Sequence, residues 1–567
     1  HAIIKAIHVD DAMSAPGVVA VFTEEQLLGV AKSVHVMRRP WVAFKQGAEH
    51  PLLAMGKTLY VGQPVVMVVA ETLQEAEDAA ASIVIEYETL SPISMSEADS
   101  GEGDPIHALF GDNVVLQDGV TNGAADARMK EATTIATGKF TVPRVAPCPM
   151  EPRGVLANYD KDSHRMTVWT STQSPHEIRT QLAHVFGEDG PDCHVIAPDV
   201  GGGFGQKHHL YPDEAVVVFG AYVLGRPVRW MEERQENIIA SQARGYAGEM
   251  EIGLDESGRV LAVKANITAD LGAYHIYGSF ISPDLVMRRL TGPYDVQDIA
   301  VDLRALVTNG PPTGPYRGAG QPEASFMMER MIDIAAQTIE MDPAEFRRRN
   351  LIRPEQFPYT TAGQLPYDTG NYEAVLDRAL ELSNYYEFRA TQSANDRLSE
   401  SLLGIGIATI TNGSGGSGGV TARSSYARLT ITRSGTIIVD SDVSPHGQGM
   451  ATTFAQLVSD QLGVDPPMVR LRTGDSSMST PAGPGSGTYA SRSLVIGGSA
   501  VYEAAGMVRD ILLKTAAQAL EVPLASVRLE QGYAVSESDA PARISLVEIA
   551  AMAGMPPEHG SDGLFEL

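Results

Sequence analysis

Glycine-rich clusters recur at the junctions between strand-like and helix-like segments, and they constrain the fold more than any other feature of this sequence. The run Gly201-Gly202-Gly203-Phe204-Gly205 lies between a strand pattern at 194–197 and an apolar helix pattern at 213–224. Gly447-Gln448-Gly449 and the stretch 483–493 also precede helix patterns. Glycine accepts positive φ angles and lets a ligand approach the main chain closely. The pattern predicts mixed α/β domains whose glycine loops either surround a ligand or form tight turns.

The chain divides into segments of different character, and its 567 residues fit several domains of roughly 100–200 residues each. Residues 1–96 alternate apolar runs with a helix pattern and predict a small α/β domain. The polar stretch 97–129 is expected to be a linker. Strand and helix patterns mix over 130–350, and 351–402 predicts a connection with one helix. The last unit spans 403–567 and again mixes strand and helix patterns.

The composition excludes several classes of function. The chain has 43 Lys and Arg against 70 Asp and Glu, a formal charge of −27, which disfavours nucleic acids and anionic membranes as partners. No apolar run approaches the roughly 20 residues of a membrane span, so no transmembrane segment is expected. Cys148 and Cys193 are too few for an iron–sulfur cluster or a cysteine zinc site. So low a cysteine content fits a reducing, cytoplasmic location.

The run at 201–205 does not match the familiar phosphate-binding fingerprints. A dinucleotide-binding G-x-G-x-x-G that begins at Gly201 would need glycine where Gln206 stands, and a P-loop would need Ser or Thr where His208 stands. A nicotinamide-dependent dehydrogenase is therefore disfavoured. His208 and His209 lack metal-ligand spacing and are expected to be solvated loop histidines.

Three further segments could contact a ligand, although each also has a purely structural interpretation. Arg317, between proline- and glycine-rich stretches, could face a ligand or bridge loop carbonyl groups. Gln448 offers a donor and an acceptor between two glycines. The Ser, Thr and Arg side chains of 488–493 suit either phosphate binding or a helix N-cap. Glu151 and Arg153 could form an ion pair and nothing more.

These segments follow one another in an order that resembles a known family. The ordered motifs are Ser171-Thr172-Gln173, Gly201-Gly202-Gly203-Phe204-Gly205, Pro315-Tyr316-Arg317-Gly318-Ala319-Gly320, Gly447-Gln448-Gly449 and Gly487-Thr488-Tyr489-Ala490-Ser491-Arg492-Ser493. Over nearly the whole chain they resemble the molybdenum-binding large subunit of the xanthine dehydrogenase / aldehyde oxidase / carbon monoxide dehydrogenase family. The resemblance implies an α+β, mixed α/β fold: an N-terminal α/β-hammerhead domain at 1–96, then two molybdenum-cofactor-binding domains at 130–350 and 403–567.

The resemblance also assigns site residues. It implies catalytic roles for Gln173, Phe204 and Arg317, near the metal, and no protein side chain as a metal ligand. The residues that it implies for binding the cofactor, molybdopterin cytosine dinucleotide, are Gly202, Gly203, Phe204, Gly205, Arg317, Gly318, Ala319, Gly447, Gln448, Gly449, Thr488, Tyr489, Ala490, Ser491, Arg492 and Ser493.

The activity that the resemblance implies is the oxidative hydroxylation of an aldehyde or an aromatic N-heterocycle with oxygen derived from water. Electrons would pass to a small [2Fe–2S] subunit and a medium FAD subunit, in a dimer of heterotrimers. An alternative is a cofactor-binding or assembly subunit without a catalytic base of its own.

Two departures from the family pattern bear on these expectations. Carbon monoxide dehydrogenases have a reactive cysteine directly after the loop arginine, where this chain has Gly318, so oxidation of carbon monoxide is disfavoured. The family's catalytic glutamate lies in a glycine-rich stretch near the end of the subunit, and no such motif follows Ser493 here. We therefore expect the native protein to extend beyond Leu567, and to begin before His1.

Overall fold

The computed structural model describes residues 1–34, 44–45, 48–240, 242–276, 278–394, 403–415, 425–478, 487–537 and 542–554. Residues 483–486 of the third glycine cluster lie outside these ranges. In the described parts of the chain, no helix is long and apolar enough to cross a membrane.

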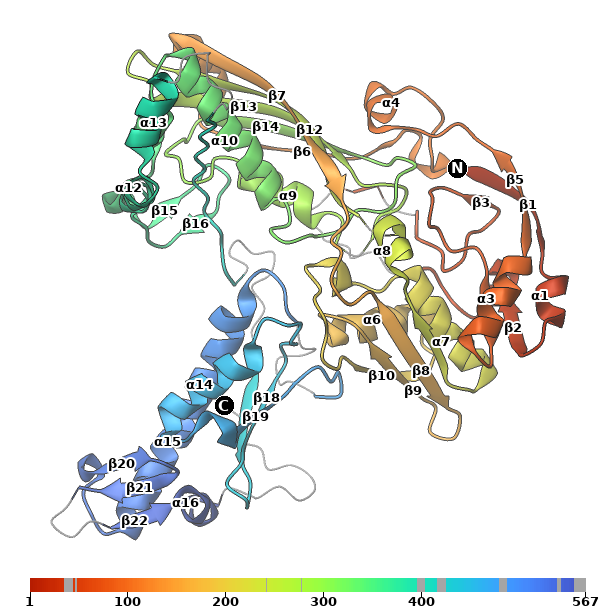
Figure 1. Cartoon of the computed structure of the whole chain (residues 1–567), viewed down its shortest axis with the longest axis vertical. Helices are drawn as coiled ribbons and strands as arrows, with labels where there is room; N and C mark the ends of the chain where they lie inside the picture. The colour runs from red at the N-terminus through yellow and green to blue at the C-terminus, as the bar shows by residue number, and fades with distance from the viewer. Residues whose placement is uncertain are drawn as a thin grey trace.

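The N-terminal unit is a small α/β domain, as expected (Figure 1). Its elements are β1 (Ala2–His8), α1 (Asp10–Ser14), β2 (Val18–Phe22), α2 (Glu24–Leu27), β3 (Lys57–Thr58), β4 (Met67–Ala70), α3 (Leu73–Ser82) and β5 (Val84–Thr89). The strands form two sheets, with orders β3-β1-β5 and β2-β4. Helix α3 begins after Thr72, whose side chain accepts a hydrogen bond from the backbone N–H of Glu75, a typical N-cap.

The second unit contains a mixed sheet of order β6-β14-β13-β12-β7, in which only β13 and β14 run parallel. Its elements are α4 (Met95–Ser100), β6 (Val114–Asn122), α5 (Ala125–Glu131), β7 (Thr134–Val145), β12 (Ala243–Leu254), β13 (Val260–Asp270), α9 (Ile281–Arg288), β14 (Ile299–Leu306), α10 (Gln321–Thr338) and α11 (Pro343–Asn350). The linker expected at 97–129 is wrong in its second half, because β6 pairs with β14 along its length. The polar residues of β6 misled the sequence pattern, since Gln117, Asp118 and Thr121 are exposed in a strand at the edge of the sheet.

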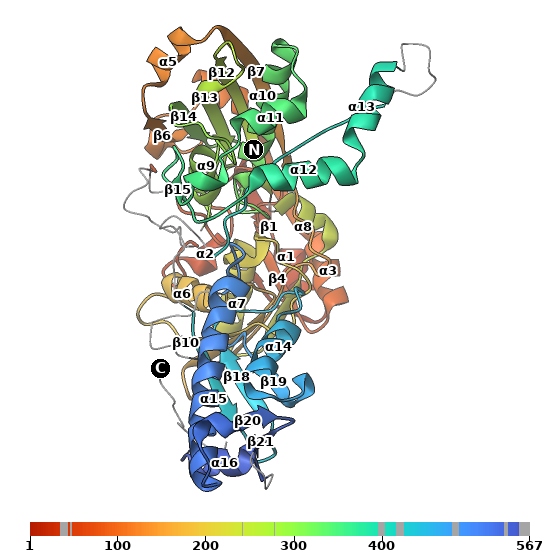
Figure 2. The same ribbon diagram turned by 90° about the vertical axis from the view of Figure 1, so that its left-hand side faces the viewer.

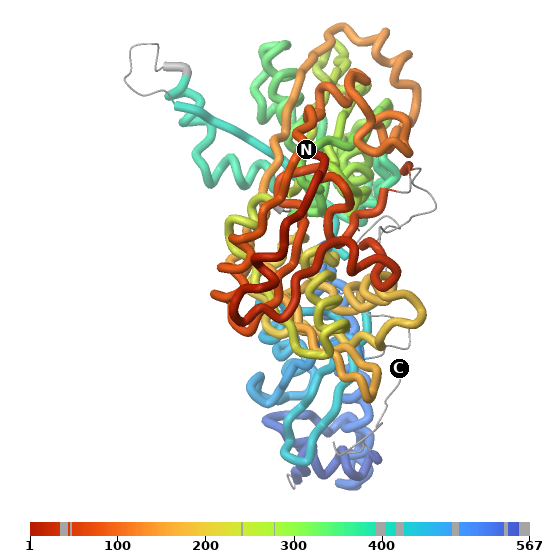
Figure 3. Tube along the Cα trace, turned by 90° about the vertical axis from the view of Figure 1, so that its right-hand side faces the viewer, coloured from red at the N-terminus to blue at the C-terminus, as the bar shows by residue number. Residues whose placement is uncertain are grey.

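A second sheet of this unit, of order β10-β9-β8-β11, carries the helices closest to the central glycine loop. Its elements are β8 (Gly154–Asp160), β9 (Arg165–Thr170), α6 (Pro175–Phe186), β10 (Asp192–Ile196), α7 (Pro212–Leu224), β11 (Val228–Met231) and α8 (Arg234–Ala240). Helix α7 is apolar on nearly all sides because it is buried between this sheet and the N-terminal domain. Phe219 on α7 makes an edge-to-face contact with Phe22, with ring centroids 5.5 Å apart. The N-terminal domain therefore shares a core with this sheet, and it lies across the body of the molecule in Figure 3.

The connection between the two larger parts holds more structure than expected. It contains β15 (Tyr359–Thr360), β16 (Pro366–Tyr367), α12 (Tyr372–Leu382) and α13 (Tyr385–Ala394). The expectation of one helix is wrong, because Asn384 adopts a positive φ of 50° that ends the first helix and redirects the chain into a second. The two helices project away from the body of the molecule (Figure 2).

The C-terminal part, shown in blue in Figure 1, is a separate α/β layer. Its elements are β17 (Ala427–Ile431), β18 (Ile437–Ser441), α14 (Met450–Leu462), β19 (Val469–Arg472), α15 (Ser499–Ala519), β20 (Val527–Glu530), β21 (Tyr533–Ser536), β22 (Arg543–Ser545) and α16 (Leu546–Met552). Its sheets have the orders β17-β18-β19 and β20-β21-β22. Edge pairing joins it to the rest: the backbone N–H of Ala197 donates to Gly474 at 2.7 Å, and that of Ser476 donates to Val195 at 2.9 Å.

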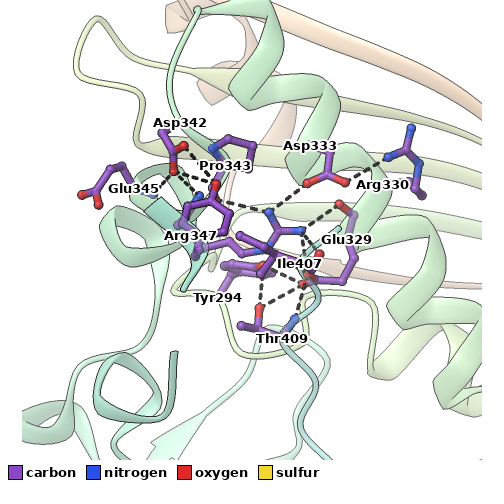
Figure 4. A network of polar contacts seen from close by, with 12 residues as sticks. Tyr294, Glu329, Arg330, Asp333, Asp342, Pro343, Glu345, Arg347, Ile407 and Thr409 are labelled. Atoms are coloured by element: carbon purple, nitrogen blue, oxygen red, sulfur yellow. Dashed lines mark hydrogen bonds and ion pairs between the residues drawn. The ribbon is translucent and has the colours of Figure 1, made fainter. Parts of the chain in front are cut away.

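A buried arginine holds α10, α11 and the crossing segment 403–415 together (Figure 4). The Arg347 side chain is fully buried and donates to the carboxylate of Glu329 at 2.9 and 3.0 Å and to that of Asp333 at 2.9 Å. It also donates to the carbonyl oxygen of Ile407 at 2.8 Å, and Glu329 accepts from the backbone N–H of Thr409 at 2.9 Å. One ion cluster thus fixes the path of the chain as it leaves the second unit.

We expect Arg347→Ala to destabilise the fold by about 3–5 kcal/mol, because it leaves the buried Glu329 carboxylate without its counter-charge. Arg330→Ala is the matched control. Arg330 also pairs with Asp333 but is 53% exposed, so its loss should cost less than about 1 kcal/mol. Urea and thermal unfolding of both variants test this; equal losses would contradict the importance of the buried cluster.

Candidate functional site

The side chain of Gln173 ties together loops from distant parts of the sequence. Gln173 is 2% exposed and follows β9. Its Oε1 accepts a hydrogen bond from the N–H of Gly205 at 2.8 Å, and its Nε2 donates to the carbonyl oxygen of Thr488 at 2.9 Å. Its own N–H donates to Lys207 at 2.9 Å, and its carbonyl accepts from the N–H of Thr488 at 3.0 Å. The central glycine loop and the 487–493 loop therefore meet at one residue.

Close packing explains the glycines around this side chain. A Cβ atom on Gly203 would lie 2.5 Å from Cγ of Gln173. At Gly205, with φ +102°, a Cβ would lie 2.4 Å from the carbonyl oxygen of Pro315, and at Gly487 it would lie 2.5 Å from that of Gln173. Real Cβ atoms do not approach backbone this closely, so the glycines allow the loops to touch.

The arginine loop is joined to the same cluster. The N–H of Arg317 donates to the carbonyl oxygen of Phe204 at 2.9 Å. Gly318, Ala319 and Gly320 all have positive φ angles and lead into the N-terminus of α10. Arg317 is exposed and the ring of Phe204 is 40% exposed. A cation and an aromatic ring are thus exposed on two residues whose backbones are hydrogen-bonded to each other.

Two loops of the C-terminal part complete the cluster. Thr488 Oγ1 donates to the carbonyl oxygen of Ser444 at 2.7 Å and accepts from the N–H of Ser444 at 3.1 Å, so the 487–493 and 444–449 loops are bound to each other. Gly447, Gln448 and Gly449 are exposed, and Gly449 precedes the first residue of α14. All five predicted loops are therefore brought together.

The residues of the 488–493 loop differ in the direction they face. Arg492 is fully buried and donates to the carbonyl oxygen of Gly487 at 2.9 Å, so it holds the loop from inside. Thr488 is also buried. Ala490 and Ser491 have positive φ angles and are exposed, while Tyr489 and Ser493 are partly exposed. The exposed and partly exposed residues of this loop are the ones able to contact a ligand.

An ion pair supports the central loop from beneath. The Glu151 carboxylate accepts from Lys207 Nζ at 2.9 Å, from Ser171 Oγ at 2.7 Å and from the N–H of Gly201 at 2.7 Å. Burial opposes its ionisation, but the hydrogen bonds from Lys207, Ser171 and Gly201 outweigh burial and hold the pKa of Glu151 below its ordinary value. Glu151 is therefore a bound, ionised support for the loop.

The expectation of solvated histidines at 208 and 209 is wrong. Both are buried, at 6% and 2% exposure. His208 Nδ1 lies 2.8 Å from Ser174 Oγ, and the ring of His209 packs against Tyr211 with centroids 4.3 Å apart. Burial, with the neighbouring His208, lowers the pKa of His209 well below its ordinary value, so it is neutral at pH 7. The pattern failed because the loop folds inward onto α6 and α7.

Several buried polar atoms around the cluster have no hydrogen-bond partner among the described residues. They include both amide atoms of Gln206, which is 2% exposed, and Oγ of Ser444. Such atoms are costly to bury unsatisfied and mark places where a ligand or water completes the bonding. Sequence reasoning missed both, since neither Gln206 nor Ser444 stands in a pattern that signals burial.

A cavity of about 760 Å³ lies beside the cluster, between the end of β10 and the C-terminal part. Its lining includes Asp199, which follows β10, and four residues of the C-terminal part: Pro445, Ala451, Arg472 and Asp475. Pro445 and Ala451 flank the Gly447–Gly449 loop at the start of α14. The cavity is thus continuous with the loops that the two parts contribute.

The sequence matches three families in consecutive ranges. Residues 1–91 match the aldehyde oxidase and xanthine dehydrogenase α/β-hammerhead domain, and residues 106–351 and 378–564 match molybdopterin cofactor-binding domains. A carbon monoxide dehydrogenase large chain from Hydrogenophaga pseudoflava is 34% identical over 92% of this chain and 67% of its own length.

The chain belongs to the molybdenum hydroxylase family.

It is a large subunit of that family, a molybdenum-dependent oxidoreductase. A nicotine 6-hydroxylase large subunit from Paenarthrobacter nicotinovorans is 32% identical over 97% of this chain and 68% of its own length. The crystal structure of quinoline 2-oxidoreductase from Pseudomonas putida 86 superposes with a TM-score of 0.88 at 33% identity, covering 99% of this chain and 72% of that one. The expected hammerhead and cofactor-binding domains are confirmed.

The cluster of this molybdenum hydroxylase fits a molybdopterin cofactor. The unpartnered amide of Gln206 and the hydroxyl of Ser444 offer hydrogen bonds to it, and the space around Gly447 and Gly449 is open to 4 Å. In the described residues, no group of three or more His, Cys, Asp or Glu could hold a metal. Amides and hydroxyls suit an organic ligand that itself carries the metal.

We expect Gly203→Ala to impair molybdenum binding and turnover in the wild-type protein, because the added methyl group collides with Gln173; such overpacking costs about 1–3 kcal/mol. In a Gln173→Ala background the same change should do much less harm, since the colliding atoms are gone. The coupling in this double-mutant cycle should be about 1 kcal/mol or more.

Molybdenum content, turnover and thermal unfolding of the four proteins measure this cycle. Gly404→Ala serves as the control, because a Cβ there meets nothing within 4 Å. Strictly additive effects would show that Gln173 does not shape the central loop.

Proposed function

We propose that the chain is the catalytic subunit of an enzyme that hydroxylates an aromatic N-heterocycle with oxygen derived from water, with aldehydes as the second substrate class. The observation that carries this proposal is the clustering of five loops around Gln173, which binds two of them directly, with Arg317 and the ring of Phe204 exposed. An aromatic ring packs favourably on Phe204, and a guanidinium stabilises negative charge that develops on a substrate.

The named relatives favour the heterocycle over the aldehyde. The nicotine 6-hydroxylase large subunit and the quinoline 2-oxidoreductase structure are 32% and 33% identical to this chain. The aldehyde oxidoreductase from Desulfovibrio gigas is 23% identical, which supports the fold alone.

Carbon monoxide is not the substrate that we propose, despite the likeness to carbon monoxide dehydrogenase chains. Gly318 follows the loop arginine with φ +102°, and a Cβ there would lie 2.5 Å from Cδ of Pro322. A reactive cysteine at this position would be strained and crowded. Elsewhere, Cys193 is buried and burial raises its pKa to about 12, which makes a poor nucleophile.

The cofactor that we propose is molybdopterin cytosine dinucleotide. The cavity of about 760 Å³ offers room for a nucleotide arm, and it adjoins the N-terminus of α14, where backbone N–H groups favour phosphate oxygens. We assign the pterin and phosphates to the exposed and partly exposed residues of the loops and to the backbone of two buried glycines, Gly202 and Gly203. The exposed and partly exposed residues are Phe204, Gly205, Arg317, Gly318, Ala319, Gly447, Gln448, Gly449, Tyr489, Ala490, Ser491 and Ser493. Thr488 and Arg492 hold these loops from inside.

When bound, the cofactor supplies the two-electron oxidation and the oxygen transfer. The chain's own residues position the reactants: Gln173 fixes the loops, Phe204 presents a stacking face and Arg317 a cation. The general base must be a carboxylate other than Glu151 or Glu323, because Glu151 is held by Lys207 and Glu323 by Arg244. We propose that a glutamate in a glycine-rich segment has that role, as the family resemblance implies.

The relatives are large subunits of multi-subunit enzymes, and we propose the same assembly here. The two cysteines of this chain cannot ligate a [2Fe–2S] centre, which takes four thiolates, so a small iron–sulfur subunit and a medium FAD subunit would carry the electrons away, in a dimer of heterotrimers. Cys148 and Cys193 carry free thiols, which fits the cytoplasm as the compartment.

The purified complex should contain about one molybdenum per copy of this chain and should release cytidine monophosphate on acid hydrolysis, since the cofactor provides the redox chemistry. Metal analysis and chromatography of the released nucleotide measure both. Active enzyme without molybdenum would refute the proposed activity, and a guanine nucleotide would refute the cofactor form alone.

Arg317→Ala should lower turnover by roughly 10²–10³-fold, because it removes a charged donor that acts on the transition state. Stability should stay within about 0.5 kcal/mol of wild type, since Arg317 is exposed. Arg226→Ala is the control, as Arg226 is 52% exposed and pairs with Glu71 far from the site. Unchanged turnover with molybdenum bound would remove Arg317 from the catalytic residues.

Affinity purification of the native protein through this chain should recover an iron–sulfur subunit and a flavin subunit. Visible absorption spectra of the complex and of this chain alone show whether the iron–sulfur and flavin absorbance belongs to the partner subunits or to this chain. Iron–sulfur absorbance in this chain alone would contradict the argument from its cysteine content.

A further inference from the structure

Arg244 has an unfavourable backbone conformation beside the arginine loop. It lies near the start of β12 with φ +65°, and Gly245 follows with φ +85°. A left-handed conformation is costly for a residue with a side chain, and such residues persist where the surrounding structure gains from them. The direction of the Arg244 side chain shows what is gained here.

The guanidinium of Arg244 bridges the arginine loop and the first turn of α10. Its Nη1 lies 3.2 Å from Oε1 of Glu323, and its central carbon lies 5.1 Å from the ring centroid of Tyr316. Tyr316 directly precedes Arg317. Glu323 is 2% exposed, and its Oε2 has no hydrogen-bond partner in the described part of the chain. Arg244 therefore supplies the charge that this buried carboxylate requires.

Backbone hydrogen bonds hold the arginine loop at two places, and the contact between Arg244 and Tyr316 lies between them. The N–H of Gln242 donates to Pro312 at 3.3 Å, and the N–H of Gly314 donates to Gln242 at 3.0 Å, which fixes residues 312–314 on the end of β12. After Gly314, the next backbone attachment of the loop is the N–H of Arg317, which donates to the carbonyl oxygen of Phe204. The stack of Arg244 on Tyr316 lies between these two attachments.

The carboxylate that Arg244 binds is also close to Arg317 in the sequence. Glu323 lies six residues after Arg317, in the first turn of the helix that the loop enters. Arg244 occupies this carboxylate, and the Arg317 side chain is exposed.

We propose that Arg244 is a positioning residue: by pairing with Glu323 and stacking on Tyr316, it holds the Arg317 loop in its outward conformation. The kinetic part of this inference rests on the proposed role of Arg317. The structural part does not.

Hydrogen–deuterium exchange tests the structural part in the complete enzyme complex. In Arg244→Gln, peptides that cover 310–320 should exchange about tenfold faster, while peptides from 201–208 should not change. Glu323→Gln should have the same effect on 310–320, and the double variant should be no worse than either single one, because the two residues act as a pair. Arg304→Gln is the matched control. Arg304 lies on β14 of the same sheet as Arg244, is 43% exposed and pairs with Asp99 on α4.

Kinetics on quinoline with a dye acceptor test the functional part. Arg244→Gln should lower kcat roughly ten- to hundredfold at unchanged molybdenum content, with a smaller effect on KM, because misplacing a group that acts on the transition state costs kcat. Arg244→Lys keeps a positive charge beside the Glu323 carboxylate and should recover part of the lost kcat.

The outcomes separate the two proposals. Unchanged exchange at 310–320 in Arg244→Gln would overturn the positioning role, as would additive effects of the two substitutions. Faster exchange without loss of kcat would show that the loop moves but that Arg317 is not needed there. Wild-type complex without molybdenum would refute the proposed activity and leave the exchange result standing.

Discussion

The buried amide of Gln173 is the contact on which the site depends. A glutamine amide both donates and accepts, and here each atom reaches a different loop: Oε1 binds Gly205 and Nε2 binds Thr488, 315 positions away. Glutamate has a similar shape but could not donate to the Thr488 carbonyl, and it would bring a buried charge. The loops pack so closely on Gln173 that no Cβ atom fits at Gly203, which faces its side chain, or at Gly487, which faces its backbone carbonyl oxygen. These two glycines are thus a consequence of the convergence.

Charged side chains divide into those that hold the scaffold and those left at the surface of the site. Arg347 is fully buried among carboxylates, and so is Arg153, which pairs with Asp213 and Glu232 at 2.6 Å. Lys207 is likewise committed to Glu151. Replacing one partner of such a cluster leaves an unpaired buried charge, so these residues fix geometry. Arg317, which is exposed, keeps its charge available to a ligand.

The sequence alone predicted the elements with strong local signals. The apolar helix pattern expected at 213–224 forms α7, a helix follows the 483–493 stretch as expected, and the order of the loops identified the family. Prediction from the sequence failed where packing between distant segments determines the structure. The polar strand β6 looked like a linker, because its partner β14 lies about 180 residues away along the chain. His208 and His209 looked solvated, because nothing local shows that their loop turns inward.

The roles within the site show the same limit. Arg492 and Thr488 belong to a motif that suits phosphates, yet their side chains are buried and face other loops. A motif fixes which residues lie close to a ligand, whereas the packing decides which of them face it. Ser444 has no motif, and only the fold shows that its hydroxyl is buried without a hydrogen-bond partner among the described residues.

The division of the site between two parts of the chain has an energetic consequence. The central loop and the arginine loop come from the first part, and the 444–449 and 487–493 loops come from the second. The strand pairing between them is short, at Val195–Ala197 with Gly474–Ser476, and the bonds between Gln173 and Thr488 add to it. A ligand that contacts both sets of loops adds its binding free energy to their association, by RT ln(1 + [L]/Kd) for the folded state. A cofactor that contacts both sets would be a structural bridge as well as a reagent, and its loss should loosen the contact between the two parts before it loosens either core.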